Sequence, residues 1–241
     1  MEHAEYGEFA LHVLTNGKFR EHTYLVEHRA SAAALLIDPG HTACERVQAH
    51  LARGVRIERV LLTHGHFDHV GGVQPLCDAL DLAADAHAGD RALMRQAQLY
   101  SVRWEQTFVP IPKRLAFFEG EPTFTWSGGT VETIAAPGHT AGSVAYRIGR
   151  MVFTGDTLFR RKVGPTYYPT ADREELLRSV ARILERVPAD AVLHAGHGRS
   201  WSAGDARAWW ETIGGAPETF DIYHEQGESP AAAADGTRNA D

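Results

Sequence analysis

The chain has 241 residues, enough for one large domain or two small ones with a substantial buried core. Its net charge of −7 argues against a general nucleic-acid binder, because such proteins carry a basic footprint. No stretch approaches the ~18 uninterrupted apolar residues of a membrane span. We therefore expect a small-molecule substrate, with neither nucleic acid nor membrane as a partner; a homodimer is compatible with these features.

Cysteine usage and the N-terminus indicate the compartment. Cys44 and Cys77 lie in no CxxC pair, so free thiols are expected, with a single disulfide as the alternative. The first residues, Met-Glu-His-Ala-Glu-Tyr, are acidic and polar, unlike a signal peptide. A reducing cytoplasm is the expected location.

Apolar runs bounded by turn residues organise the first third of the chain. They predict strands at 9–14, 24–26, 34–37, 57–62 and 82–87. Thr42 is expected to cap a helix that runs to about Arg53. A second helix is predicted over 70–80, where Gly71 and Gly72 allow close backbone approach.

Residues 90–121 are the hardest to interpret. They begin with a helical pattern and continue into an aromatic and proline-rich run that contains Trp104 and Phe118. We expect a lid-like insertion or a partner surface, with a satellite cluster packed on the core as the alternative.

The second half predicts an antiparallel meander followed by helices. Short strands are expected at 123–126, 130–135, 143–148 and 150–154. An amphipathic helix over 172–187 starts at the cap Asp172, and a strand at 191–193 and a helix over 204–213 follow. The composition of 226–241 predicts a flexible tail. The order of elements favours one domain over 1–225, a two-sheet sandwich with helices outside.

Residues 63–72, Thr-His-Gly-His-Phe-Asp-His-Val-Gly-Gly, contain four metal-binding groups within six positions. They are His64, His66, Asp68 and His69. Neither a solvent-facing helix nor a simple strand accounts for this pattern. Imidazole nitrogens and a carboxylate are the ligands of a zinc-like ion, so the run predicts a loop folded around a cation.

Three further candidate ligands follow apolar strands, each beside a glycine. They are His139 in Pro-Gly-His-Thr-Ala-Gly-Ser, Asp156 in Thr-Gly-Asp-Thr-Leu-Phe, and His197 in Gly-His-Gly. Loops just past strands are where a rigid scaffold presents functional groups. Taken singly each has an ordinary explanation as a turn or surface residue, but a joint accident with the histidine loop is improbable.

These motifs, in this order, resemble the metallo-β-lactamase fold superfamily, whose HxHxDH motif matches residues 64–69. The resemblance covers roughly residues 9–213. It implies an α/β protein with a four-layer αββα sandwich, in which two mixed β-sheets lie between outer helices.

Carried onto this chain, the resemblance assigns a ligand to each of seven positions. His64, His66 and His139 would hold one metal, Asp68, His69 and His197 the other, and Asp156 would bridge them. Two divalent ions, zinc with iron or manganese as alternatives, would then share a hydroxide that attacks a carbonyl carbon. Asp68 is also the candidate catalytic group, orienting water or passing a proton to the leaving group.

Within that superfamily the chain is similar to glyoxalase II, hydroxyacylglutathione hydrolase, around 155–159 and 164–172. Tyr167 stands where that family has a glutathione-contacting tyrosine, whereas the family's nearby lysine is Pro165 here. Arg160, Arg161 and Lys162 could supply positive charge, and Arg161 and Lys162 with Tyr167 are the predicted substrate contacts. The alternative explanation of the basic run is a solvated loop.

The resemblance thus predicts a glyoxalase II-like hydrolase that cleaves a thioester or ester. The alternatives are a lactonase of the same fold and a mononuclear iron persulfide dioxygenase-like enzyme, which would need only the counterparts of His64, His139 and Asp156. Thr63 and Thr140 flank ligands and could bond to them or to loop backbone. His194 could orient a ligand or be an ordinary structural histidine.

Overall fold

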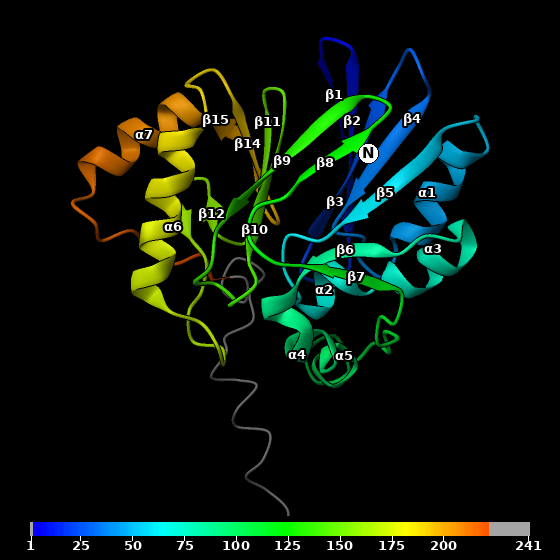
Figure 1. The fold of residues 1–241 in the computed structure, drawn as a ribbon. Helices are drawn as coiled ribbons and strands as arrows, with labels where there is room; N and C mark the ends of the chain where they lie inside the picture. Colours follow the sequence, from blue (N-terminus) through cyan, green and yellow to red (C-terminus); the bar gives the residue numbers. More distant parts are fainter. Residues whose placement is uncertain (1, 222–241) are drawn as a thin grey trace, which may run out of the picture.

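Two β-sheets lie face to face between two layers of helices in the computed structural model, which describes residues 2–221 (Figure 1). The first sheet has seven strands in sequence order from β1 to β7. Its strands are β1 (Glu2–Tyr6), β2 (Phe9–Asn16), β3 (Glu21–His28), β4 (Ala33–Ile37), β5 (Arg56–Leu61), β6 (Ala84–His87) and β7 (Leu115–Phe118). Strands β1 to β4 are antiparallel neighbours, and β4 to β7 are parallel.

The second sheet has six strands in the order β15-β14-β11-β10-β9-β8. They are β8 (Thr123–Trp126), β9 (Gly129–Ala135), β10 (Val144–Ile148), β11 (Met151–Gly155), β14 (Val192–Ala195) and β15 (Trp201–Ser202). A separate hairpin joins β12 (Leu158–Phe159) to β13 (Lys162–Val163). The predicted meander is therefore confirmed, with boundaries shifted by a residue or two.

Helices cover the outer face of each sheet. Along the first sheet lie α1 (Ala43–Leu51), α2 (Phe67–Val70), α3 (Val73–Leu80), η1 (Ala88–Asp90), α4 (Arg91–Met94) and α5 (Ala97–Glu105). The second sheet is covered by α6 (Arg173–Arg186) and α7 (Ala203–Thr212) (Figure 1). As predicted, Asp172 begins α6, and its carboxylate accepts the amide of Glu175 at 2.9 Å.

Three layers of apolar packing hold the sandwich together. Leu14, Leu25 and Val47 belong to the core between the first sheet and its helices. The central layer joins Leu11, Tyr24 and Leu35 of the first sheet to Val144, Tyr146 and Phe153 of the second. A third core, with Val152 and Val180, lies under α6 and α7. The predicted four-layer αββα architecture is confirmed.

The helix predicted over 70–80 is divided in the structure. Phe67–Val70 forms a helical turn, and α3 begins only after Gly71 and Gly72. The Gly72 amide donates to Pro39 O at 2.8 Å, and a Cβ on Gly72 would lie 2.3 Å from Gly40 O. The close approach expected of these glycines therefore joins the histidine loop to the turn after β4.

Four other expectations need correction or comment. Residues 115–118 are the edge strand β7 rather than part of an insertion, so the segment outside the sheet ends before Leu115. Thr42 does not cap α1, because its hydroxyl donates to Asn16 Oδ1 at 2.8 Å. Strand β1 was not predicted, because its polar sequence lacks an apolar run. The predicted tail, 226–241, lies outside the described residues.

Both cysteines are free thiols, as expected. Among residues 2–221, no helix combines the length and the apolar character that crossing a bilayer requires.

Candidate metal centre

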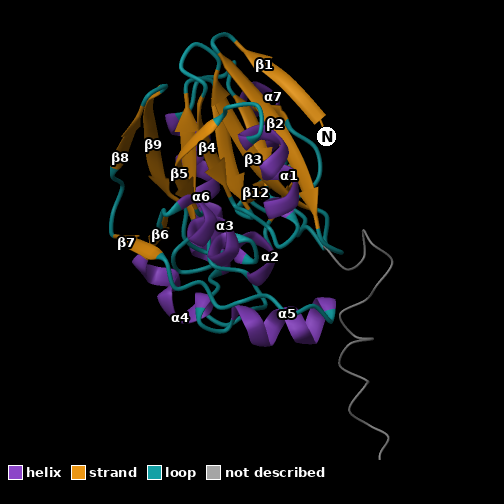
Figure 2. Ribbon diagram, turned by 90° about the vertical axis from the view of Figure 1, so that its right-hand side faces the viewer, coloured by secondary structure: helices purple, strands orange, loops and turns teal. Residues whose placement is uncertain are grey.

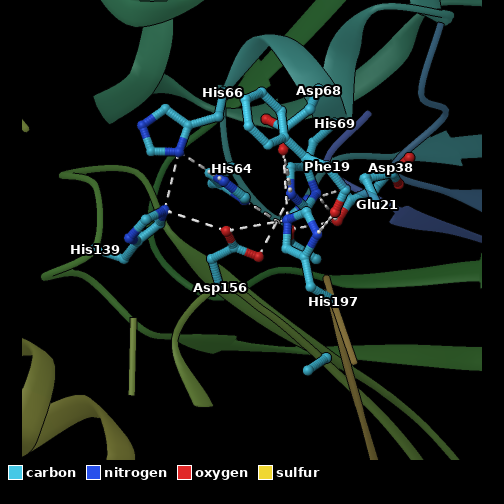
Figure 3. Close-up of polar contacts among 12 residues, drawn as sticks. Phe19, Glu21, Asp38, His64, His66, Asp68, His69, His139, Asp156 and His197 are labelled. Carbon is cyan, nitrogen blue, oxygen red and sulfur yellow. Dashed lines mark hydrogen bonds and ion pairs between the residues drawn. The ribbon is translucent and has the colours of Figure 1, made fainter. Parts of the chain in front are cut away.

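The seven predicted ligands meet at one end of the sandwich (Figure 3). His64 and His66 lie in the loop after β5, and Asp68 and His69 on the helical turn α2. Asp156 and His197 follow β11 and β14, a parallel pair whose carboxyl ends share one edge of the sheet. The same geometry that aligns strands in a sheet thus gathers side chains that are far apart in sequence.

Three imidazoles converge on one side of Asp156. His66 Nδ1 lies 3.1 Å from His64 Nε2 and 2.9 Å from His139 Nε2. His139 Nε2 lies 3.6 Å from Asp156 Oδ2. One donor atom from each of these four residues lies within 4.8 Å of the others.

A second group converges on the other side of Asp156. Asp68 Oδ2 lies 3.4 Å from His197 Nε2 and 3.8 Å from His69 Nε2. The Asp156 carboxylate reaches this group too, at 3.4 Å from His69 Nε2 and 3.6 Å from His197 Nε2. Asp156 therefore lies between two sets of three nitrogen and oxygen donors, as Figure 3 shows.

Hydrogen bonds on the far side of the rings determine which nitrogen faces inward. His139 Nδ1 donates to Pro165 O at 2.8 Å, and His197 Nδ1 to Phe19 O at 2.9 Å. A carbonyl oxygen only accepts, so both protons are on Nδ1 and both Nε2 atoms keep a free lone pair. An imidazole fixed in this way is ready to bind a metal ion.

Asp38 orients two more histidines and was missed by sequence reasoning. Its buried carboxylate lies 3.0 Å from His69 Nδ1 and accepts the amide and the hydroxyl of Thr63. The Thr63 hydroxyl also lies 3.1 Å from His64 Nδ1. Asp38 therefore orients the His64 ring indirectly, through Thr63. Asp38 follows β4 in Asp-Pro-Gly, which has the pattern of an ordinary turn.

Asp90 joins two of the ligand loops and was also missed. It accepts the amide of Gly65 at 2.8 Å and the amide of Gly142 at 2.7 Å. The Thr140 hydroxyl donates to it at 2.7 Å. The Thr140 hydroxyl therefore bonds to a buried carboxylate, rather than to a ligand or to loop backbone as expected.

Orphaned polar atoms test whether this donor set fits metal ions. His69 Nε2, His197 Nε2 and Asp156 Oδ1 are all buried without a hydrogen-bond partner. Leaving such atoms unpaired is costly, and bound cations would satisfy all three. The imidazole and carboxylate composition is that of zinc, iron or manganese sites. The residues therefore fit the metals that the motif predicts.

Burial and charge separate the pKa values of the histidines. Burial lowers the pKa of His64 well below its usual value and, with His139 adding repulsion, lowers that of His66 to about 3. Burial would also lower the pKa of His69, but the Asp156 and Asp68 carboxylates outweigh it and raise that pKa well above the usual value. One set thus presents neutral imidazoles, and the other surrounds an imidazole with negative charge.

A sequence model of the metallo-beta-lactamase superfamily matches residues 16–197, three quarters of the chain and all seven of these positions. The chain belongs to that superfamily. A hydroxyacylglutathione hydrolase, GloC, from Haemophilus influenzae is 31% identical over 181 residues, covering 72% of this chain and 84% of that protein.

Two solved structures extend the likeness. A B3 metallo-beta-lactamase, BLEG-1, superposes with a TM-score of 0.76 at 26% identity, covering 82% of this chain and 96% of its own. TTHA1623, solved in a di-iron-bound form, superposes with a TM-score of 0.71 at 36% identity, covering 80% and 95%. This member of the superfamily therefore shares its fold both with a B3 metallo-beta-lactamase and with a protein that binds two iron ions.

An apolar pocket opens onto the metal-ligand residues. It has a volume of about 620 Å³, part of which is open to solvent, and it is lined by His66, Asp68, His139 and Asp156. Aromatic and aliphatic side chains form its walls, namely Phe19, Phe67, Leu93, Tyr100, Trp104 and Phe220. Three of these come from the segment expected to form a lid, so α4 and α5 make one wall of the pocket.

The predicted substrate contacts are only partly at this pocket. Tyr168, rather than Tyr167, lines it, with its ring 5.1 Å from that of His66. Tyr167 is 54% exposed, and its ring is tilted by 50° against that of Tyr168 with the centroids 4.6 Å apart. Lys162 lines a neighbouring groove together with Arg160 and Arg199, whereas Arg161 lines neither this groove nor the pocket.

His194 is a structural histidine rather than a group that orients a ligand. Its Nδ1 lies 2.8 Å from the Ser200 hydroxyl and its Nε2 lies 3.2 Å from the Tyr6 hydroxyl. Its ring stacks on Phe153 in the central core. Burial and the neighbouring His22 lower the pKa of His194 to about 3.

Substituting Asp38 tests whether it positions the ligands. Asp38→Asn removes the charge that anchors His69 and Thr63, so metal affinity should fall by about 10- to 100-fold. Chelator competition measures this affinity. The exposed Asp78, which pairs with Arg114, offers the control Asp78→Asn. Equal affinities in the two variants would contradict the role assigned to Asp38.

His194 should make folding stability depend on pH. Its pKa is depressed in the folded state, so its contribution is present above its unfolded pKa of about 6.5 and is lost as the pH falls. Between pH 7 and pH 5 the loss should be about 2 kcal/mol. Urea unfolding at both values should therefore show a smaller decline for His194→Gln than for the wild type. Equal declines would refute this.

Proposed function

We propose that the protein is a dinuclear metal-dependent hydrolase that cleaves a thioester or ester. The observation that carries this proposal is the position of the Asp156 carboxylate between two sets of three donors. A single-metal enzyme would have no use for the second set. His64, His66 and His139 would hold one ion, and Asp68, His69 and His197 the other, with Asp156 shared. Zinc is the favoured metal, with iron or manganese as alternatives.

Bound metal ions would supply a water of lowered pKa and polarise the carbonyl under attack. The protein's own groups position and protect this chemistry. The bonds of His69 to Asp38, His139 to Pro165 O and His197 to Phe19 O keep the rings from turning. The apolar pocket walls exclude bulk water, which strengthens electrostatic interactions inside.

Asp68 is the proposed proton-handling residue. It is one of the few charged groups that line the pocket, and its Oδ2 atom lies 3.4 Å from His197 Nε2. Burial would raise the pKa of this carboxyl, but His69 and His197 outweigh burial and lower it. Asp68 is thus ionised, and its other oxygen, Oδ1, would accept a proton from water and then return it to the leaving group.

The pocket supports a substrate with an apolar acyl portion. Tyr100, Trp104 and Phe220 offer apolar surface close to the ligand residues. Beyond Phe220, which lines both spaces, the groove with Arg160, Lys162 and Arg199 offers positive charge. A thioester with an apolar acyl group and an anionic thiol portion would fit both. The likeness to GloC supports a hydroxyacylglutathione-type thioester within that class.

A lactonase and a mononuclear persulfide dioxygenase are the competing proposals. The dioxygenase would leave His66, Asp68, His69 and His197 without a metal to bind, although His69 Nε2 and His197 Nε2 are buried and orphaned. Those atoms favour the dinuclear hydrolase.

The location in a reducing cytoplasm and the homodimeric state remain predictions.

The function is tested with metal-replete protein and a panel of substrates. Hydroxyacyl thioesters should be hydrolysed faster than lactones, β-lactams and phosphodiesters. Asp68→Asn should lower kcat by about 100-fold or more, because proton transfer contributes about 10²–10⁴. Asp172→Asn, at the start of α6, is the control. Oxygen uptake on a persulfide without ester cleavage would contradict the proposed hydrolase. Full activity in Asp68→Asn would contradict the proton transfer assigned to Asp68.

Two adjacent tyrosines form a matched pair for the pocket. Tyr168→Ala removes a ring that lines the pocket. It should raise KM by about tenfold, because the substrate loses a buried aromatic contact. Tyr167→Ala removes an exposed ring and should change KM little. Steady-state kinetics on the preferred thioester measure both. A larger effect at Tyr167 would contradict the role given to Tyr168 and would support Tyr167 as the substrate contact, as the sequence predicts.

A further inference from the structure

A second group of metal-binding side chains lies outside the candidate catalytic centre. His12 on β2, Glu27 on β3 and His50 on α1 offer donor atoms that all lie within 4.8 Å of one another. None of the three lines the pocket described above. Three elements far apart in sequence therefore bring two imidazoles and a carboxylate to one point.

The position of this group on the sheet is unexpected for polar residues. His12 shares its face of β2 with Leu14, and Glu27 shares its face of β3 with Leu25, because alternate residues of a strand point the same way. Leu14 and Leu25 pack in the core under α1. His12 and His50 are only 8% and 2% exposed. Apolar side chains would normally fill such positions.

One donor atom of the group is left without a hydrogen bond. His12 Nε2 is buried and unpartnered, at 3.4 Å from Glu27 Oε2. The rings of His12 and His50 meet edge to face with centroids 4.5 Å apart. A buried polar atom aimed at a carboxylate and a second imidazole is what a cation would satisfy.

A cation already touches the group from the solvent side. The Arg53 guanidinium lies 2.8 Å from His50 Nδ1 and 4.0 Å from Glu27 Oε2. Its side chain is 60% exposed, so it can swing away at little cost. His3, on β1, lies beside His12 with ring centroids 4.8 Å apart and pairs with Glu5.

We propose that His12, Glu27 and His50 form a second, separate site for a zinc-like divalent ion. Two imidazoles and one carboxylate are an established ligand set for zinc, and they leave a coordination position open towards solvent. The ion would displace Arg53 and fasten α1 to β2 and β3. Because α1 follows the turn that holds Asp38, the site stabilises the helix next to that anchor.

The protonation of the histidines suits this role. Burial lowers the pKa of His12, and burial with the neighbouring His12 lowers that of His50 to about 4. Both imidazoles are therefore neutral at neutral pH, and little proton release opposes metal binding.

Zinc stoichiometry tests the site on the full-length protein. Chelator-treated wild type, Glu27→Gln and His50→Gln are reloaded with zinc alone, dialysed, and assayed for zinc per chain. Each variant should hold one zinc fewer than the wild type and retain the wild-type hydrolase activity. His28→Gln, beside Glu27 on β3 but bonded to Ser31, should match the wild type.

Arg53→Gln gives an independent measurement on an exposed side chain. Removing the competing cation should tighten the weakest zinc by about tenfold. Circular dichroism establishes that each variant folds. Equal zinc counts in the wild type and a folded Glu27→Gln or His50→Gln variant would overturn the proposal. If neither of those variants folds, unchanged zinc affinity in Arg53→Gln would overturn the proposal. Arg53 would then be the only cation that this cluster binds in the wild type.

Discussion

Hydrogen bonds on the outer edge of the histidine rings are the constraint on which the centre depends. Polar rings crowded into a buried site need partners that fix their orientation, so the fold must hold them in place. His139 and His197 are held by backbone carbonyls, and His69 by the Asp38 carboxylate. The inward Nε2 atoms of His139 and His197 are therefore presented as acceptors before any cation arrives, and all three rings are already oriented, which reduces the cost of ordering them on binding.

The fold provides the candidate ligands and the groups that orient them from both sheets. Asp38 follows β4 of the first sheet, and Asp156 and His197 follow strands of the second. The Tyr24 hydroxyl donates to Ala195 O across the central layer at 2.5 Å, which ties β3 to the strand that delivers His197. The central apolar layer keeps the two strand ends opposed. A change that shifts one sheet against the other would thus disturb both donor sets together.

The candidate ligand positions could be identified from sequence because they are local motifs. Four of them lie within six residues, and the other three each follow an apolar strand beside a glycine. The groups that orient them could not. Asp38 has the sequence pattern of a turn, and Asp90 acts on loops 25 and 52 residues away. Only the folded chain brings these carboxylates to their partners.

The predicted substrate contacts show the same limit at finer scale. Tyr167 and Tyr168 are adjacent, and which one faces the pocket depends on the backbone of an irregular loop. Arg161 sits at positive φ in the turn between β12 and β13, which directs its neighbours rather than itself to the basic groove. The strand at 115–118 escaped prediction because its short apolar run lies within an aromatic and proline-rich segment. Sequence patterns therefore identified the candidate metal ligands more accurately than the residues that line the pocket and groove.

Anomalous X-ray diffraction from crystals of the purified protein tests the central claim most directly, because it locates each metal in space. Two peaks are expected at this centre, one beside His64, His66 and His139 and the other beside Asp68, His69 and His197, with the Asp156 carboxylate between them; a peak beside His12, Glu27 and His50 would belong to the separate site. A single peak at the centre, beside His64, His139 and Asp156, with the second set of donors empty, would contradict the dinuclear proposal.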